Sequence, residues 1–469
     1  MTGILRYTNP DDYHSSPMNI KSPTAAAMER RSAYNIDLYT GALSLQLPLL
    51  STSHASIQVP VTLSYSGSGI KVDEYSGWVG LGWSLQAGGV ISRKTNDMAD
   101  EYYNRSVYLP TGTAGKDAGY YFTGRTLDRT DWSSTAYLRS KLSSVSLNDS
   151  MVDMEPDEFV FSFGGYSGSF YRSETGEWKV KSKQNITLEI EEVLDNSGNF
   201  KLWYRFHPFN DNDDPWTSSS LFERVASLFT RFTITTPDGF RYIFGGDTTA
   251  IEFSRGMIDI SNIHTMDKKE NYITANAWYL TKIISPQNDT VSFEYKPARA
   301  LFKKFITRIP QVYDERVGFS SSHYALSGIT INQVFLRAIH TPTTRIDFYV
   351  NNSTELPLSA ATWVDPPPVY SSPDRYLKDQ LCLHWNDLRY EEDYIEFPNN
   401  MRKLDSIKVY EKQTGKYTNG IKLYYKQNTT QRKTLDSVLF YDFEHAVKGE
   451  LYKFEYNNIS LFPPYESPG

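Results

Sequence analysis

Residues 64–93 of this 469-residue chain read SYSGSGIKVDEYSGWVGLGWSLQAGGVISR. This stretch places seven glycines between short apolar runs and carries two tryptophans, Trp78 and Trp83, five residues apart. Glycine is needed where φ is positive or where a large ring comes close to the backbone. Short alternating runs such as residues 90–92 are typical of half-buried strands. The stretch therefore predicts tight β-turns that hold large rings, and its structural signature is Trp78, Gly80, Gly82, Trp83, Gly88 and Gly89.

The composition indicates a β-rich chain with a large core. Aromatic residues make up 14%, including 34 tyrosines, and hydrophobic residues 39%. Aromatic side chains pack well on the pleated surface of strands, and tyrosine also serves at wet surfaces. The net charge of −7 offers no clustered basic face, so we expect no nucleic-acid partner.

The single cysteine, Cys382, excludes an internal disulfide framework and a cysteine-rich metal site. No run is long enough to span a bilayer. Residues 1–17 lack the apolar core of a signal peptide, and residues 462–469 have the composition of a linker that follows a strand. We therefore expect the chain to be part of a longer protein.

The order of hairpin signals predicts an all-β fold, in which antiparallel hairpins form a large curved or spiral sheet. The clearest signal is Asp238-Gly239 between two β-forming runs, because Asp-Gly favours a tight hairpin turn. Residues 277–295, 406–426 and 437–456 repeat this design. The expected organisation is an N-terminal extension over 1–35, a Gly/Trp-rich β segment over 36–96, a polar insertion over 97–150, and a hairpin array over 151–469 with helical insertions near 218–229 and 374–388.

The ordered landmarks of the chain resemble the N-terminal region of Bacteroidetes-type RHS/YD-repeat proteins. The most specific landmark is residues 78–93, WVGLGWSLQAGGVISR; others are residues 22–27, 39–41, 63–65, 155–159, 165–168, 236–239, 278–283 and 452–457. A more distant likeness, through the GLGW block, is to the Salmonella virulence plasmid B protein and the B component of Tc toxins.

The resemblance implies that the chain opens a long β-sheet spiral. In Tc toxins and RHS proteins such a spiral forms a hollow shell around a C-terminal cargo. The chain lacks the YD repeats, the C-terminal core, the self-cleavage site and the toxin domain of the family. We therefore expect a shell's opening section that is secreted or lies at the cell surface. Its expected partners are the remainder of its own longer chain or a companion shell protein.

Candidate catalytic and metal-binding residues are few. The acidic cluster Asp153, Glu155, Asp157 and Glu158 could supply the carboxylate pair of a glycosidase, but a solvated strand edge that discourages sheet pairing is favoured. Residues 210–214, NDNDD, lack the glycine and the distal glutamate of an EF-hand loop. The eight histidines show no H-x-x-x-H pair, and we expect no metal or cofactor.

The favoured function is a non-catalytic structural scaffold. The main alternative is a carbohydrate- or surface-binding module, with surface glycans as its partners, because exposed tryptophans or tyrosines could stack on a sugar. A glycoside hydrolase built on the acidic cluster is less favoured. For Trp78 and Trp83 we favour buried plugs of the β-turn, since large aromatic side chains dominate core energetics.

Overall fold

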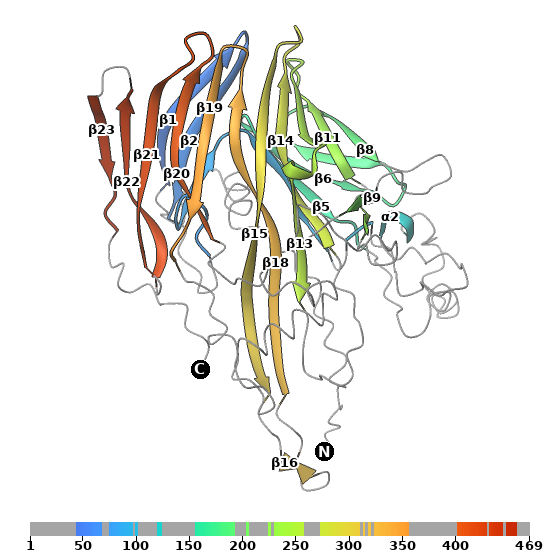
Figure 1. The fold of residues 1–469 in the computed structure, drawn as a ribbon. Helices are drawn as coiled ribbons and strands as arrows, with labels where there is room; N and C mark the ends of the chain where they lie inside the picture. The colour runs from blue at the N-terminus through green and yellow to red at the C-terminus, as the bar shows by residue number, and fades with distance from the viewer. Residues whose placement is uncertain are drawn as a thin grey trace, which may run out of the picture. The chain divides into compact units, whose positions relative to one another are not determined.

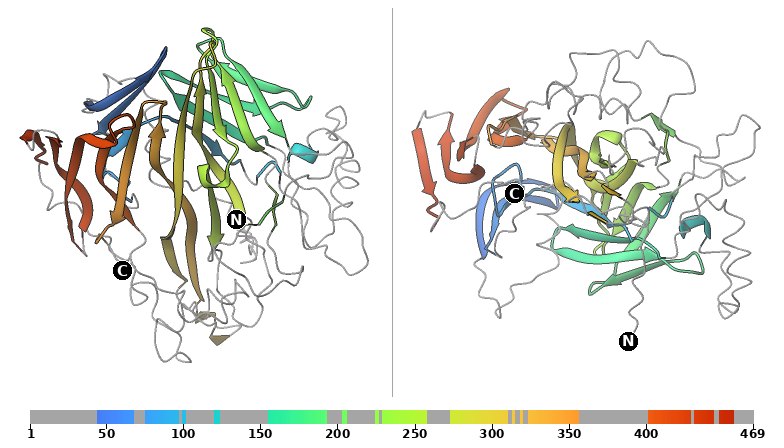
Figure 2. Two further views of the ribbon diagram at one scale, coloured as in Figure 1. Left: turned by 45° about the horizontal axis from the view of Figure 1, so that its top comes forward. Right: turned by 90° about the horizontal axis from the view of Figure 1, so that it is seen from below.

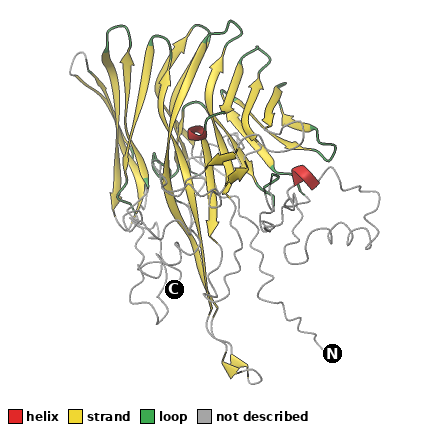
Figure 3. Ribbon diagram, turned by 45° about the vertical axis from the view of Figure 1, so that its right-hand side comes forward, coloured by secondary structure: helices red, strands yellow, loops and turns green. Residues whose placement is uncertain are grey.

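The computed structural model describes residues 44–67, 75–96, 99–101, 120–123, 155–192, 203–205, 224–226, 229–257, 273–309, 313–314, 318–319, 323–355, 401–428, 431–443 and 447–456. Strands account for nearly all regular structure in these ranges (Figure 3). They pair antiparallel throughout, which confirms the predicted all-β class.

Compact packing divides the chain into two units. The smaller comprises Met1–Asn19, Thr95–Asp157 and Arg172–Glu177, and the larger comprises Ile20–Lys94, Glu158–Tyr171 and Trp178–Gly469. The Gly/Trp-rich segment and most of the hairpin array, which the sequence pattern sets apart, thus share the larger unit. In the smaller unit, the short helix α2 (Tyr120–Thr123) is anchored where the Tyr121 N–H donates to the Asp100 carbonyl at 2.9 Å.

The larger unit contains a 3-stranded sheet in the order β1-β2-β3 and a 16-stranded sheet. The first consists of β1 (Ser44–His54), β2 (Ile57–Ser66) and β3 (Trp83–Gln86). The main path of the second runs β23-β22-β21-β20-β19-β18-β13-β14-β4-β5-β6-β7 (Figure 1). Its strands are β4 (Gly89–Lys94), β5 (Glu158–Phe163), β6 (Tyr166–Arg172), β7 (Trp178–Ser182), β13 (Ile251–Met257), β14 (Ile273–Ile284), β18 (His323–His340), β19 (Thr344–Asn352), β20 (Arg402–Glu411), β21 (Lys416–Asn428), β22 (Gln431–Asp442) and β23 (Val447–Lys453).

The 16-stranded sheet branches at β14. The N-terminal half of this strand lies between β13 and β4, whereas its C-terminal end pairs with β12 (Arg241–Gly245) and β15 (Thr290–Ile309). β12 pairs in turn with β11 (Phe229–Thr235), and β11 with β8 (Thr187–Glu192). The short helix η3 (Thr248–Ala250) precedes β13. Two small ribbons also occur: β9 (Trp203–Arg205) with β10 (Arg224–Ala226), and β16 (Tyr313–Asp314) with β17 (Gly318–Phe319).

An aromatic core fills the space beside the branch. Phe159 stacks on Phe170 at a centroid distance of 5.2 Å and meets Phe232 and Trp278 at 5.6 and 5.7 Å. The Trp278 indole donates to the Phe229 carbonyl at 2.8 Å, so its polar atom is satisfied. Strands from distant parts of the chain are thereby joined by buried rings, which carry much of a core's energy.

Two sequence expectations are corrected by the described strands. Residues 224–226 form β10 and Phe229 begins β11, so the described residues of the expected helical insertion at 218–229 are strand. The insertion expected at 374–388 lies outside the described residues. β4 is buried over all of residues 89–93 and is not half-buried. Consecutive residues point to opposite faces, so both faces are covered, while β5 and β14 pair with its two edges.

The 3-stranded sheet faces the C-terminal strands of the 16-stranded sheet within the larger unit (Figure 2). A direct contact joins the two sheets where the Thr52 and Thr344 hydroxyls lie 3.1 Å apart. β2 presents one apolar face to the interior, because every second residue from its start, Ile57, Val59, Val61 and Leu63, is buried. This arrangement brings the predicted signature residues to strands that come much later in the chain.

Candidate functional site

The turn over residues 77–83, here called the Gly/Trp turn, is fastened to the C-terminal strands by backbone hydrogen bonds. The Leu81 N–H donates to the Lys433 carbonyl on β22, and the Leu404 N–H of β20 donates to the Trp78 carbonyl, both at 2.9 Å. Buried backbone groups need such partners because an unpaired one is costly. The signature stretch thus joins the two sheets of the larger unit.

Both tryptophans of the turn are buried, at 5% exposure for Trp78 and 2% for Trp83. Trp83 packs on Phe454 and Tyr65 at centroid distances of 4.6 and 5.2 Å. Its indole N–H donates to the Tyr456 hydroxyl at 2.7 Å, and that hydroxyl donates to the Leu435 carbonyl at 2.7 Å. Burial favours the plug over the sugar-stacking platform for both tryptophans, and the indole bond adds to this for Trp83.

The glycines of the signature lie where backbone or rings come close. Gly80 has φ of +102° and Gly82 of +75°, in the region that favours glycine. A Cβ atom on Gly80 would lie 2.9 Å from the Leu435 backbone nitrogen, and one on Gly82 would lie 2.8 Å from the Tyr65 ring. Gly88 and Gly89 similarly abut the Phe293 and Phe163 side chains. Larger residues at Gly80 would push the turn off β22.

We expect Gly80→Ala to destabilise the protein more than Gly165→Ala does. Gly165 has a similar φ of +85°, but a Cβ atom there would meet nothing within 4 Å, so its substitution introduces backbone strain alone. Gly80→Ala adds the clash with β22, and overpacking of this kind costs about 1–3 kcal/mol more. Chemical denaturation of both variants measures the difference, and equal losses would contradict a tight docking at Gly80.

A fully buried ion pair lies beneath the Gly/Trp turn. Lys433 Nζ is 3.0 Å from Glu355 Oε1, and the two side chains are 0% and 1% exposed. Glu355 also accepts from the Lys433 backbone N–H at 2.6 Å and from the Ser76 hydroxyl, while Lys433 Nζ donates to the Arg402 carbonyl at 2.8 Å. Burial lowers the pKa of Lys433, and the Glu355 carboxylate opposes that shift. Nothing in the sequence pattern singles out this pair.

Of the acidic cluster, Asp157 serves the backbone, whereas Glu155 is exposed. Within the smaller unit, Asp157 is fully buried, and its carboxylate accepts from the backbone N–H groups of Asn96 and Asp100 at 2.9 and 3.0 Å. The expected solvated edge is therefore wrong for Asp157, which precedes β5 and is satisfied by backbone donors. Glu158 is half-buried in β5, and Asp153 lies outside the described residues.

The other candidate residues that the structure describes are not brought together. His54 lies 3.7 Å from Asp289 and His340 lies 3.1 Å from Glu294, as separate pairs. Among the described residues there is no group of three or more His, Cys, Asp or Glu side chains placed to hold a metal. Residues 210–214 and Cys382 lie outside the described ranges. No described helix is long and apolar enough to cross a membrane.

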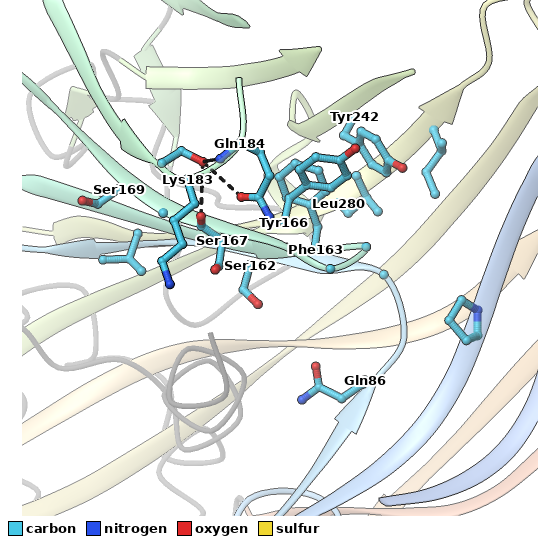
Figure 4. Close-up of a pocket in the computed structure, with 18 of the residues that line it drawn as sticks. Gln86, Ser162, Phe163, Tyr166, Ser167, Ser169, Lys183, Gln184, Tyr242 and Leu280 are labelled. Carbon is cyan, nitrogen blue, oxygen red and sulfur yellow. Dashed lines mark hydrogen bonds between the residues drawn. The ribbon is translucent and has the colours of Figure 1, made fainter. Parts of the chain in front are cut away.

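A hollow of about 990 Å³ lies in the larger unit beside the hairpin of β5 and β6 (Figure 4). We name it the β2–β5 hollow. Its described lining comprises Gln58, Val59, Pro60, Thr62, Gln86, Gly88, Glu158, Val160, Ser162, Phe163, Gly164, Gly165, Tyr166, Ser167, Gly168, Ser169, Lys181, Ser182, Lys183, Gln184, Tyr242, Leu280 and Ile283. No sequence motif assigned a binding role to these residues. Among them, Gly165-Tyr166-Ser167-Gly168 is a landmark of the resemblance, and these residues form one wall of the hollow.

No family model matches the chain, and no curated protein matches it. Similar solved structures include the Photorhabdus luminescens Tc holotoxin pore, with 12% identity, a TM-score of 0.35, and coverage of 89% of this chain and 16% of that chain. The TcdB2-TccC3 crystal structure has 11% identity, a TM-score of 0.35 and the same coverage. The N-terminal domain of the effector SpvB from Salmonella typhimurium has 10% identity and a TM-score of 0.32, over 85% of this chain and 98% of that one. The chain therefore spans about a sixth of the Tc toxin chains it matches.

Proposed function

We propose that the chain is a structural scaffold without catalytic activity, the opening section of an RHS/YD-repeat shell of the Bacteroidetes type. In the longer protein this shell would encase or present a C-terminal cargo, in a secreted or cell-surface protein. The partner would be the remainder of the same chain or a companion shell protein. The proposal is supported by the Gly/Trp turn, whose rings and glycines join the first sheet to later strands, and by the structural role of Asp157.

The observation that carries the proposal is the edge strand β23. Within the described residues it pairs with β22 alone, and Leu451 is 60% and Tyr452 39% exposed. Phe443 in the turn after β22 and Tyr424 on β21 are also exposed, as is Tyr349 further along the sheet on β19. An edge with exposed apolar side chains is a template for a further strand, and exposed apolar patches mark interaction sites. A continuing shell would cover this end of the sheet.

Hydrogen exchange tests the proposal. Within residues 447–453 some amides face β22 and the others face the open edge. We expect those at the open edge to exchange rapidly in this chain alone and to be protected at least about tenfold in the longer gene product or in a mixture with its companion protein. The hairpin of β11 and β12 is the internal control, because its strands are already paired on both sides and should not change. Equal exchange at residues 447–453 in all samples would overturn the proposal.

A further inference from the structure

The β2–β5 hollow arises where one continuous stretch of chain passes between two sheets. β3 pairs with β2 in the 3-stranded sheet, and after residues 87 and 88 the chain continues as β4, which pairs with β5 in the 16-stranded sheet. Gly88, with φ of +96°, allows the change of direction. β2 and β5 therefore separate at this point, and the space between them is built by paired strands and a tight hairpin.

One wall of the hollow is aromatic. Phe163 stacks on Tyr166 with ring centroids 5.5 Å apart and planes inclined by 21°, and it packs on Tyr242 at 4.5 Å. Both tyrosines are half-buried and lie side by side in Figure 4. Burial, with Asp238 and Tyr166 nearby, raises the pKa of Tyr242 to about 12, so its hydroxyl remains protonated at neutral pH. The wall offers apolar ring surface with hydroxyl groups at its margin.

The remaining lining is rich in uncharged hydrogen-bonding groups that are held in place. The Gln184 backbone N–H donates to the Ser182 hydroxyl at 3.2 Å, and that hydroxyl donates to the Gln184 side-chain oxygen at 3.3 Å. Across the hollow, the Gln86 amide donates to the Ser84 hydroxyl at 2.9 Å. Each carboxamide has both donor and acceptor capacity beyond one such bond.

The lining carries one carboxylate and two lysines, and the carboxylate offsets one of the lysines. The Glu158 carboxylate accepts from the Ser169 hydroxyl at 2.7 Å and lies 3.8 Å from the Lys181 ammonium. Lys181 in turn lies over the Tyr171 ring at 4.6 Å. A phosphate or sulfate site would be expected to direct several cations at one point, whereas here the lining lysines Lys181 and Lys183 are exposed. The chemistry therefore favours an uncharged ligand.

We propose that the β2–β5 hollow binds a short uncharged oligosaccharide, with a sugar ring against Tyr166 and Tyr242 and its hydroxyls bonded to Gln86 and Gln184. A pyranose has an apolar C–H face and an equatorial rim of hydroxyls, which match the aromatic wall and the carboxamides. Pockets of about 300–1,000 Å³ with a few placed polar groups are the usual size of ligand sites, so the hollow has room for more than one ring. This inference concerns a surface other than the β23 edge and does not depend on the shell proposal.

Isothermal titration with defined sugars tests the inference. The probes are tetrasaccharides of glucose, xylose, mannose and N-acetylglucosamine, with a heparin tetrasaccharide and inorganic phosphate as charged comparators. We expect at least one uncharged tetrasaccharide to bind with a Kd on the order of 1 mM or tighter. Tyr166→Ala should weaken that binding about tenfold, which is the scale of one lost aromatic contact.

Two further variants make the test specific. Gln86→Ala removes a half-buried carboxamide without opening the core, and it should also weaken sugar binding. It therefore serves as the test if the Tyr166→Ala variant does not fold. Tyr349→Ala, an exposed tyrosine on β19 outside the lining, should leave the Kd within about twofold of the unchanged chain. The inference would be overturned by no binding of any uncharged sugar, by binding of the charged comparators alone, or by binding that both hollow variants leave unchanged.

Discussion

Replacing Glu355 by alanine is expected to lower the free energy of unfolding by about 3–5 kcal/mol, the cost of leaving one partner of a buried ion pair alone. The Lys433 ammonium, 0% exposed, would lose its carboxylate. The Ser76 hydroxyl and the Lys433 backbone N–H would lose their acceptor as well. Guanidinium unfolding followed by tryptophan fluorescence measures the loss.

The matched control is Arg337→Ala, which breaks an exposed pair. Arg337 lies 2.9 Å from Glu294, but the two side chains are 63% and 43% exposed. Such pairs contribute about 0–1 kcal/mol. A double variant, Glu355→Leu with Lys433→Met, should recover part of the loss, because apolar replacement of a whole buried pair is often close to neutral. A loss at Glu355→Ala no larger than at Arg337→Ala would contradict the buried pair.

Trp83→Ala is expected to cost about 3–5 kcal/mol, as for other large-to-small changes of buried aromatic residues. The indole packs on Phe454 and Tyr65 and donates to Tyr456. Its removal should loosen the end of the chain locally. We therefore also expect faster exchange of the Phe454 amide, which donates to the Asp436 carbonyl at 2.8 Å in the native protein.

Two variants separate packing from hydrogen bonding at Trp83. Trp83→Phe keeps a ring but removes the indole donor, so its cost should be smaller, at about 1–2 kcal/mol. Tyr424→Ala, at an aromatic residue that is 41% exposed, should change stability by no more than about 0.5 kcal/mol. If Trp83→Ala behaved like Tyr424→Ala, the indole would not hold the Gly/Trp turn against the C-terminal strands.

The hairpins could be predicted because their signals are local. Residues 232–244 carry Asp238-Gly239 between β-forming runs, and β11 and β12 pair around that turn with Gly239 at φ of +84°. The alternation of residues 158–163 likewise appears as alternating burial in β5. The turn residues determine the hairpin of β11 and β12, and the two-residue period of the side chains determines the burial pattern of β5.

The long hairpin partner β18 and the following strand β19 were not predicted. β18 pairs with β15 from Ile309↔His323 to Ser292↔His340, so the far end of this hairpin joins residues 48 positions apart. The burial of Lys433 and Glu355 was equally hidden, because charged side chains are almost never fully buried unless they are paired. Pairing across 78 positions cannot be inferred from either local sequence.

The candidate sites were predictable only in part. The glycines and tryptophans of the signature pointed to a turn that holds rings, but the partners Phe454 and Tyr456 come from the far end of the chain. The β2–β5 hollow depends on where two sheets separate, which no motif records. Asp157 was a candidate member of a catalytic carboxylate pair, whereas in the structure its carboxylate accepts hydrogen bonds from backbone N–H groups.

The bond between Trp83 and Tyr456 joins residues 373 positions apart, and this sets the order of events during synthesis. At translation rates of about 5–20 residues per second, the nascent N-terminal sheet waits roughly 20–75 s for the strand that completes it. During that interval the Trp83 indole has no Tyr456 acceptor, although the entropic cost of closing a loop rises only slowly with its length. Folding of this chain is therefore completed late, and a nascent chain that stops before residue 456 lacks the Tyr456 hydroxyl that accepts from the Trp83 indole N–H.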